Sequence, residues 1–226
     1  MAIRRDVFFY HYGSLTGRSI HKNFYNSEEQ QDGFRHALIR KHGLKNFLKL
    51  RGDGVNFNIG SIGFGQHTWE KEEMRKWCMG KGADIGCGAY KTVPDAIGVD
   101  LTPKDSYGTG GSQLYAKSQA DITITDLKLP FNDSELDYVV ASHVLEHIVD
   151  DMAALSEWVR VLKPGGYLIV AVPDEDKVDG LPLDPTHKHT YHEEALKRKL
   201  GYITQYKVMT VNKRVISMVM IFRISK

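Results

Sequence analysis

The sequence predicts an α/β protein built around a mostly parallel sheet. Between residues 82 and 173, short apolar segments that end in Gly, Asp or Ser alternate with polar connections, which is typical of parallel α/β folds. The chain has 226 residues, of which 42% are hydrophobic and 26% charged, as in an ordinary globular protein. We therefore expect one or two domains with a sizeable buried core.

Charge and cysteine content exclude several classes of function. Thirty basic and 28 acidic residues leave a formal net charge of +2, so no overall excess of charge favours a nucleic acid or a membrane as partner. The two cysteines, Cys78 and Cys87, are too few for a disulfide framework or a four-thiolate metal site. No apolar run has the length of a signal peptide or a bilayer span. We therefore expect a cytoplasmic protein.

The first 79 residues lack the α/β rhythm. Ser27 and the two glutamates after it are typical of a helix start, and a second helix is predicted from Thr68 through Trp77. Residues 55–59 alternate with period two, which indicates a small hairpin. We expect residues 1–79 to form a helical and hairpin extension that caps the ligand pocket of a domain formed by residues 80–226.

The strongest signal is a pair of short strands followed by glycine or aspartate, residues 83–88 (ADIGCG) and 96–100 (AIGVD). A Gly-x-Gly loop lets the backbone approach a ligand closely, because a Cβ at Gly86 or Gly88 would collide with it. A dinucleotide fold requires a third glycine where this chain has Lys91, and the carboxylate of Asp84 would repel a pyrophosphate but attract an ammonium group. Asp100 can accept hydrogen bonds from both ribose hydroxyls. The pattern fits a nucleoside with a cationic amino-acid tail, as in S-adenosylmethionine.

These motifs, with residues 129–147 (LPFNDSELDYVVASHVLEH) and 160–166 (RVLKPGG), resemble the class I S-adenosylmethionine-dependent methyltransferases. The resemblance is close over residues 80–173 and looser elsewhere. It implies a doubly wound, mostly parallel, seven-stranded Rossmann-like sheet with S-adenosylmethionine as cofactor. Strands six and seven would be residues 202–211 and 214–224, the last one inserted antiparallel. Residues 163–166 (KPGG) would form the turn that leads into strand five.

The resemblance also implies where the cofactor binds. The aspartate before the LPF block and its neighbour would lie by the adenine, and the end of strand four would lie under the methionine end. The implied cofactor-binding residues are Asp84, Ile85, Gly86, Cys87, Gly88, Asp100, Leu101, Asp126, Leu127, Ser142 and His143. Isolated aspartates are more often caps or turn residues, but Asp84 and Asp100 flank the glycine loop together, which favours the functional interpretation. Cys87 has no basic neighbour and is interpreted as a small loop residue.

The connection between the first two strands departs from the family. Only residues 89–96, which include Pro94, separate Gly88 from Ile97, whereas a crossover helix needs about ten residues or more. We expect a loop or a single turn there. A subgroup with the same short crossover and the same ASHxLEH ending has many members encoded near genes for glycans or surface polysaccharides, which favours a glycan acceptor.

Two histidines are the candidates for catalysis. A general base is needed mainly if the acceptor is a hydroxyl, and His147 and His187 could serve. Glu146 and His147 are expected to begin the helix after strand four, and a structural role for His147 is equally expected. His187 lies in residues 174–192, a long polar segment that leaves strand five and is expected to form a rim over the acceptor. His187, His189 and His192 could also bind a metal ion, but histidines at local spacing without a second ligand group are a poor signal, so we expect no metal.

The expected function is methyl transfer from S-adenosylmethionine to oxygen or nitrogen of a small-molecule or glycan acceptor. Two alternatives stay open: a catalytically silent module that binds S-adenosylmethionine, and a nicotinamide-dependent oxidoreductase, which Lys91 and Asp84 disfavour. Amino groups of nucleic acids are disfavoured as acceptors, because strand four does not end in the Asn/Asp-Pro-Pro-aromatic corner that holds them. Neither the acceptor nor the oligomeric state follows from the sequence.

Overall fold

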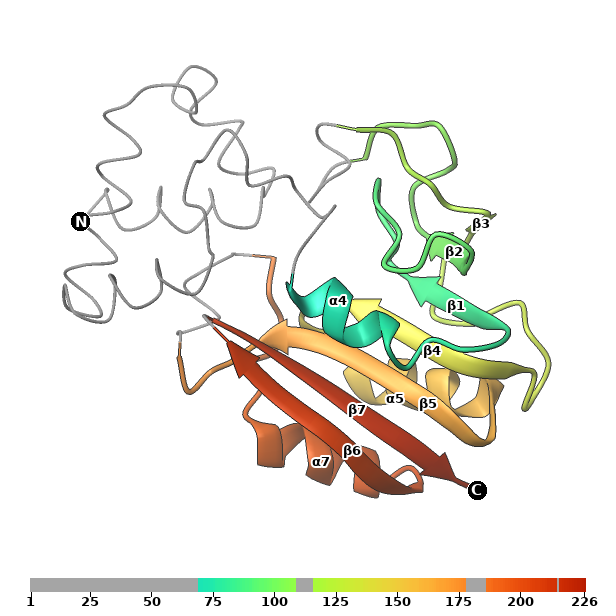
Figure 1. Cartoon of the computed structure of the whole chain (residues 1–226). Coiled ribbons are helices and arrows are strands. Elements are labelled where there is room, and N and C mark those ends of the chain that lie inside the picture. The colour runs from blue at the N-terminus through green and yellow to red at the C-terminus, as the bar shows by residue number, and fades with distance from the viewer. Residues whose placement is uncertain (1–68, 109–115, 178–185, 215) are drawn as a thin grey trace, which may run out of the picture.

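A computed structural model describes residues 69–108, 116–177, 186–214 and 216–226 (Figure 1). Its seven-stranded sheet has the order β3-β2-β1-β4-β5-β7-β6. The strands are β1 (Gly82–Ile85), β2 (Ile97–Asp100), β3 (Ile122–Thr123), β4 (Leu136–Ser142), β5 (Leu162–Pro173), β6 (Gln205–Arg214) and β7 (Ser217–Ser225). The predicted seven-stranded sheet is therefore confirmed. The helix and hairpin expected within residues 1–68 lie outside the described residues.

The strand directions also agree with the sequence prediction. Strands β1 to β5 pair in parallel, and β7 pairs antiparallel with both β5 and β6. Strand β6 begins at residue 205, three residues later than predicted, because the preceding helix continues to Gly201 and Tyr202 caps it through its backbone N–H.

Helices cover both faces of the sheet, as a doubly wound fold requires. Helices α5 (Asp151–Val161) and α7 (Glu193–Gly201) pack on one face, and α4 (Trp69–Arg75) packs on the other (Figure 1). Side chains of β4 alternate between the two cores: Val139 and Ala141 join the first, and Tyr138 and Val140 the second. A strand that is buried on both faces reads as a continuous apolar run, which is why residues 138–141 show no polar alternation.

Two local predictions were wrong. Glu146 and His147 do not begin the helix after β4 but belong to a separate 3-10 turn, η2 (Leu145–His147). Helix α5 begins at Asp151, and Asp150 before it accepts the backbone N–H of Ala153 at 2.9 Å. The KPGG segment is not a turn before β5 but an irregular stretch within it. The register against β4 shifts there, and Gly165 has a φ of +80° that favours glycine.

The short crossover between β1 and β2 contains no helix, as predicted. Its conformation depends on Lys91, whose ammonium donates to the carbonyl of Ala96 at 2.9 Å and pairs with Asp121. The Lys91 stem also covers Gly98, where an added Cβ would lie 2.7 Å from Lys91 Cε. Lys91 therefore packs against β2 where a crossover helix would otherwise lie.

The strand order places the ligand crevice. The chain proceeds from β1 outward through β2 and β3, and then returns to the other side of β1 with β4 and β5. In open α/β sheets, ligands bind at the carboxyl ends of the strands where the order reverses, which in this sheet is between β1 and β4. No helix in the described part of the chain is long and apolar enough to span a membrane.

Candidate functional site

The glycine loop lies at this crevice and folds back over the end of β2. Gly86 and Gly88 have φ of +64° and +58°, a conformation that side chains strongly disfavour. The backbone N–H groups of Gly86 and Cys87 donate to the carbonyl of Val99 at 2.8 and 3.3 Å. An added Cβ at Gly86 would lie 2.3 Å from Val144 Cγ2. Glycine is therefore required at residue 86 by the protein's own packing, in addition to the close ligand approach inferred from the sequence.

Asp100 connects the glycine loop to the end of β2. One carboxylate oxygen accepts the N–H of Gly88 and the other accepts the N–H of Thr102, each at 2.9 Å. Each oxygen has a second lone pair, so the carboxylate can still accept hydrogen bonds from a ligand. The next side chain, Leu101, is 68% exposed and offers an apolar surface beside it. A carboxylate next to an exposed leucine suits a ribose and its base.

Asp84 is buried beneath the crossover. Its carboxylate accepts the backbone N–H of Thr92, and burial raises the pKa of Asp84 to about 6, although that hydrogen bond and the positive charge of Lys71 oppose the shift. Burial also lowers the pKa of Lys71 to about 8, against the attraction of Asp84, and its ammonium donates to the carbonyl of Tyr90. Lys71 is on α4, and its contact with Asp84 could not be read from the sequence.

Ile85, the last residue of β1, and Cys87, in the loop after it, are both buried. Burial raises the pKa of the Cys87 thiol far above its usual range, and the negative charges of Asp84 and Asp100 raise it further. A thiol with a raised pKa is a poor nucleophile, in agreement with its interpretation as a small loop residue.

The two residues predicted beside the adenine lie in the connection between β3 and β4. Asp126 is exposed and its carboxylate accepts the N–H of Lys128 at 2.8 Å, whereas Leu127 is half-buried against the core. An open hollow of about 370 Å³ adjoins this connection and is lined by Ile122, Thr123, Ile124, Thr125, Asp126, Lys128, Leu129 and Pro130. Asp126 thus faces a space that a ligand can enter.

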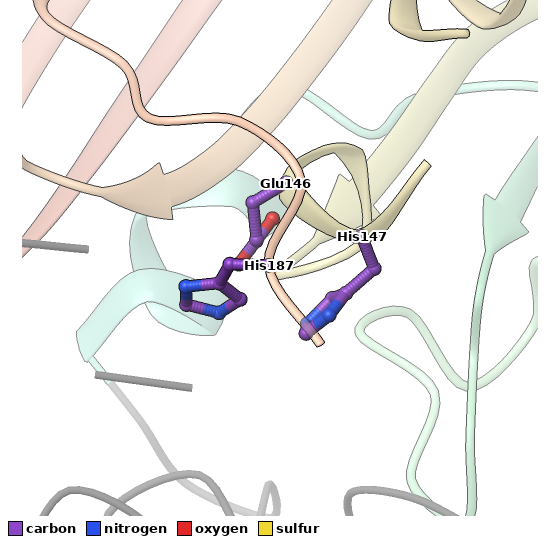
Figure 2. A group of neighbouring side chains, drawn as sticks. All are labelled: Glu146, His147 and His187. Carbon is purple, nitrogen blue, oxygen red and sulfur yellow. The ribbon is translucent and has the colours of Figure 1, made fainter. Parts of the chain in front are cut away.

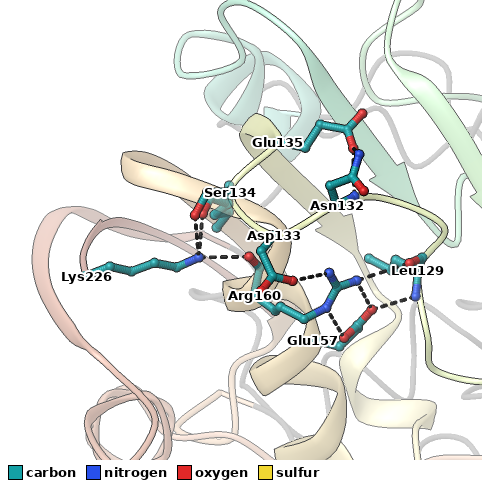
Figure 3. A network of polar contacts seen from close by, with 9 residues as sticks. Leu129, Asn132, Asp133, Ser134, Glu135, Glu157, Arg160 and Lys226 are labelled. Carbon is teal, nitrogen blue, oxygen red and sulfur yellow. Dashed lines mark hydrogen bonds and ion pairs between the residues drawn. The ribbon is translucent and has the colours of Figure 1, made fainter.

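Helix α5 holds the second half of this connection in place (Figure 3). Arg160 donates to both carboxylate oxygens of Glu157 at 2.8 and 2.6 Å, to Asp133 at 2.7 Å and to the carbonyl of Leu129 at 3.1 Å. Glu157 also accepts the N–H of Leu129 at 2.7 Å, and Lys226 at the C-terminus donates to the carbonyl of Arg160 at 2.8 Å. The arginine of the RVLKPGG motif therefore anchors the LPF block.

Ser142 and His143 end β4 at the other side of the crevice. His143 has a φ of +55°, its N–H donates to the carbonyl of Ala171 at 2.8 Å, and its Nδ1 lies 3.2 Å from Glu146 Oε1. Burial would lower the pKa of His143, but the hydrogen bond and charge of Glu146, together with Glu70, raise it overall. Burial would raise the pKa of Glu146, but the same contact with His143 lowers it overall.

The two catalytic candidates lie side by side (Figure 2). The rings of His147 and His187 meet edge to face, with their centroids 4.7 Å apart, and His147 Nδ1 lies 2.9 Å from Thr186 Oγ1. Lys188 donates its backbone N–H to the carbonyl of Glu146 at 2.7 Å, so the described end of the rim segment packs on η2. Residues 178–185 of that segment lie outside the described residues.

The other two histidines of the rim segment point elsewhere. His189 Nε2 lies 3.0 Å from the carbonyl oxygen of Val149, and His192 Nδ1 lies 2.8 Å from Asp176. Among the described residues, the side chains that could together hold a metal ion are those of Glu146, His147 and His187. His189 and His192 do not belong to this cluster. Sequence reasoning did not assign Glu146 to the site, although its position in the ASHVLEH block was a signal.

Comparisons with known proteins agree with this arrangement. Residues 79–170 match the family profile described as a methyltransferase domain. A demethylmenaquinone methyltransferase from Staphylococcus saprophyticus is 30% identical over 145 residues, which cover 58% of this chain and 59% of that protein. Crystal structures of S-adenosylmethionine-dependent methyltransferases from Thermotoga maritima and Aquifex aeolicus share the fold, with TM-scores of 0.53 and 0.52 and identities of 18% and 14%. The aligned regions cover 85% and 79% of this chain, respectively, and 98% of each of the two solved structures.

Residues 79–170 are therefore similar to a methyltransferase domain, and solved structures that share the fold are S-adenosylmethionine-dependent methyltransferases. These similarities support the predicted enzyme class and cofactor. The chain spans 59% of the length of the Staphylococcus saprophyticus protein, so the activity of the whole protein and its acceptor are matters of proposal.

Proposed function

We propose that this protein transfers the methyl group of S-adenosylmethionine to oxygen or nitrogen of a small-molecule or glycan acceptor. One observation carries the proposal. The Gly86–Gly88 loop, the carboxylate of Asp100 and the end of β4 meet at the edge of the sheet where the strand order reverses, with two histidines beside them. A nucleoside cofactor and an acceptor can thus lie side by side.

On this proposal the cofactor-binding residues are those predicted from the sequence. Asp100 binds the ribose, Leu101, Asp126 and Leu127 flank the adenine, and the glycine loop with Ser142 and His143 binds the amino-acid end. Asp84 contributes mainly by holding the crossover from beneath, because its carboxylate is 1% exposed and already accepts the backbone N–H of Thr92. When bound, S-adenosylmethionine supplies a methyl group that is activated by the positive sulfur. The chain's own contribution is then to hold and align two reactants, which is worth up to about 7–11 kcal/mol of the barrier in favourable systems.

His147 and His187 belong to the acceptor side in this proposal. They follow β4 and β5, two neighbouring strands, and so approach the crevice from beyond the cofactor's amino-acid end. An acceptor hydroxyl has to lose a proton on methylation, and groups at this position can help it do so. Residues 1–79 are proposed to cap the pocket. Helix α4, the described part of that extension, packs against the sheet.

Two acceptor classes compete. The short crossover and the ASHVLEH block favour a glycan, by resemblance to their subgroup. The name of the Staphylococcus relative instead favours a quinone-like small molecule.

Because both cysteines are free thiols, we retain the cytoplasm as the proposed location.

Calorimetry and a transfer assay test the proposal together. The purified chain should bind S-adenosylmethionine and S-adenosylhomocysteine, and NAD should not compete. Methyl transfer is then measured with radiolabelled cofactor against sugars, nucleotide sugars and demethylated quinones. Turnover at an oxygen or nitrogen atom supports the proposal, and the class of acceptor decides between glycan and quinone. Methylation of a quinone ring carbon would contradict the proposed acceptor atoms. Binding without turnover across the panel would favour the silent module, and absence of cofactor binding would refute the proposal.

A further inference from the structure

Two segments that are distant in sequence bring three metal-ligating side chains together. Glu146 and His147 come from η2 after β4, and His187 comes from the rim segment after β5 (Figure 2). Each offers one ligand atom, and these atoms all lie within 4.8 Å of one another. Glu146 and His187 are buried, and His147 is half-buried.

Glu146 gives this cluster an independent reason to hold a cation. The side chain is 1% exposed, and its Oε1 accepts from His143, but its Oε2 has no hydrogen-bond partner in the described part of the chain. A buried carboxylate oxygen without a hydrogen-bond partner destabilises the fold. A bound cation would satisfy that oxygen.

The surrounding contacts orient the possible ligands. When His147 Nδ1 donates to Thr186 Oγ1, the lone pair of the ring is on Nε2, where a metal ion can bind. His143 contacts Oε1 of Glu146 and so orients the carboxylate, which leaves Oε2 for the ion. Partners of this kind commonly position metal ligands in proteins.

We propose that Glu146, His147 and His187 bind a divalent transition-metal ion of the zinc type. Two imidazoles and one carboxylate are a known donor set for zinc, and three protein ligands leave the fourth position open for another molecule. Zinc ligands at about 2.1 Å from a tetrahedral ion lie about 3.4 Å apart, so separations of up to 4.8 Å must shorten by at most about 1.4 Å. Side-chain rotations can supply that movement. Magnesium, which prefers oxygen ligands, does not suit two imidazoles.

The position of this ion would give it a role, which rests on the proposed function. The cluster begins three residues after His143, beside the proposed place of the amino-acid end of the cofactor. An acceptor hydroxyl that binds a zinc-type ion loses its proton more readily than a free one. The two histidines would then act on the acceptor through the ion. This proposal replaces the expectation of no metal, which considered His187 only with His189 and His192.

Zinc binding is measured directly on the full chain after chelator treatment and dialysis. Calorimetry with zinc chloride should show one equivalent bound, and Glu146→Gln and His187→Ala should each weaken binding at least tenfold. His192→Ala is the matched control, since it removes a histidine of the same segment that contacts Asp176 instead, and it should bind zinc like the unmodified chain. Cobalt(II) provides a second readout, because its visible spectrum reports tetrahedral nitrogen and oxygen ligands.

Two results would overturn the metal site. One is absence of stoichiometric zinc binding to the unmodified chain, and the other is zinc binding that Glu146→Gln and His187→Ala leave unchanged. Circular dichroism identifies any variant that fails to fold, in which case His147→Gln takes its place. Cofactor affinity of the metal-free chain is measured in parallel. Cofactor binding without zinc binding defeats only the metal site, and zinc binding without cofactor binding defeats only the proposed function.

Discussion

Replacing Asp100 tests the cofactor site most directly. In the structure both carboxylate oxygens already hold the loop, through the N–H groups of Gly88 and Thr102, and both retain a lone pair for a ligand. Asp100→Ala removes all of these acceptors. A hydrogen bond to a charged group contributes about 1.5–3 kcal/mol, so loss of a single ribose contact should weaken S-adenosylmethionine binding roughly 10- to 150-fold.

Asp100→Asn separates loss of the ligand contact from loosening of the loop. The amide keeps one acceptor oxygen for the backbone but removes the charge, so its effect on affinity should be smaller than that of alanine. Calorimetry gives the affinities, and thermal unfolding of the same samples shows how much stability each variant loses. Asp95→Asn, an exposed aspartate of the crossover, is the control and should bind like the unmodified chain.

Unchanged affinity in a folded Asp100→Ala variant would refute the reasoning, because loss of a ribose contact has to weaken cofactor binding and a role limited to holding the loop does not. An equal loss in the Asp95→Asn control would also refute it, since the effect would then reflect general charge rather than a contact.

Three further outcomes are expected. Arg160→Ala should lower the free energy of unfolding by about 1–3 kcal/mol, because it breaks the paired hydrogen bonds to Glu157 and frees the connection before β4, as chemical denaturation can measure. Asp84→Asn should remove a pH dependence of the free energy of unfolding. The Asp84 carboxyl has a pKa of about 6 in the folded chain and 3.8 ordinarily, so it destabilises the fold progressively as pH rises from about 4 to 6, by up to about 3 kcal/mol. Denaturation at both pH values measures the difference. Gly86→Val should reduce stability by about 2 kcal/mol or more as well as cofactor affinity, because the new Cβ would strain the backbone and collide with Val144, and an added Val144→Ala change should restore part of the stability.

Each of these outcomes has a control. Arg223→Ala removes an exposed arginine whose hydrogen bond to Gly165 is long, at 3.4 Å, and should cost little; an equal cost would contradict the role given to Arg160. The Asp84 reasoning fails if the unmodified chain and Asp84→Asn show parallel pH profiles between pH 4 and 6. Stability of Gly86→Val equal to that of the unmodified chain would show that the loop tolerates a side chain.

Much of the proposed cofactor side is recognisable in the sequence because it is encoded locally. The glycine loop has to follow a strand directly, and the acidic residue has to end the next strand, so Gly86, Gly88 and Asp100 are recognisable from their spacing. The loop conformation of the crossover also followed from its eight residues. The exact limits of elements were less predictable, because η2 and α5 are separated by the cap at Asp150, a contact that depends on side-chain geometry.

The acceptor side could not be predicted in the same way. Glu146 and His187 are 41 positions apart in the chain, and they meet because β4 and β5 are adjacent parallel strands whose carboxyl ends share one edge. Lys71 reaches Asp84 because α4 packs across the sheet, which no local pattern encodes.

The sequence by itself determined the class of fold, the glycine loop and the order of the strands along the chain, since all three depend on residues close together in sequence. Only the tertiary structure decided which ionisable groups are buried together, namely Asp84 with Lys71 and Glu146 with His143, His147 and His187. The physical reason is that burial and charge pairing depend on distances between segments, and those distances are set when the sheet and its helices pack.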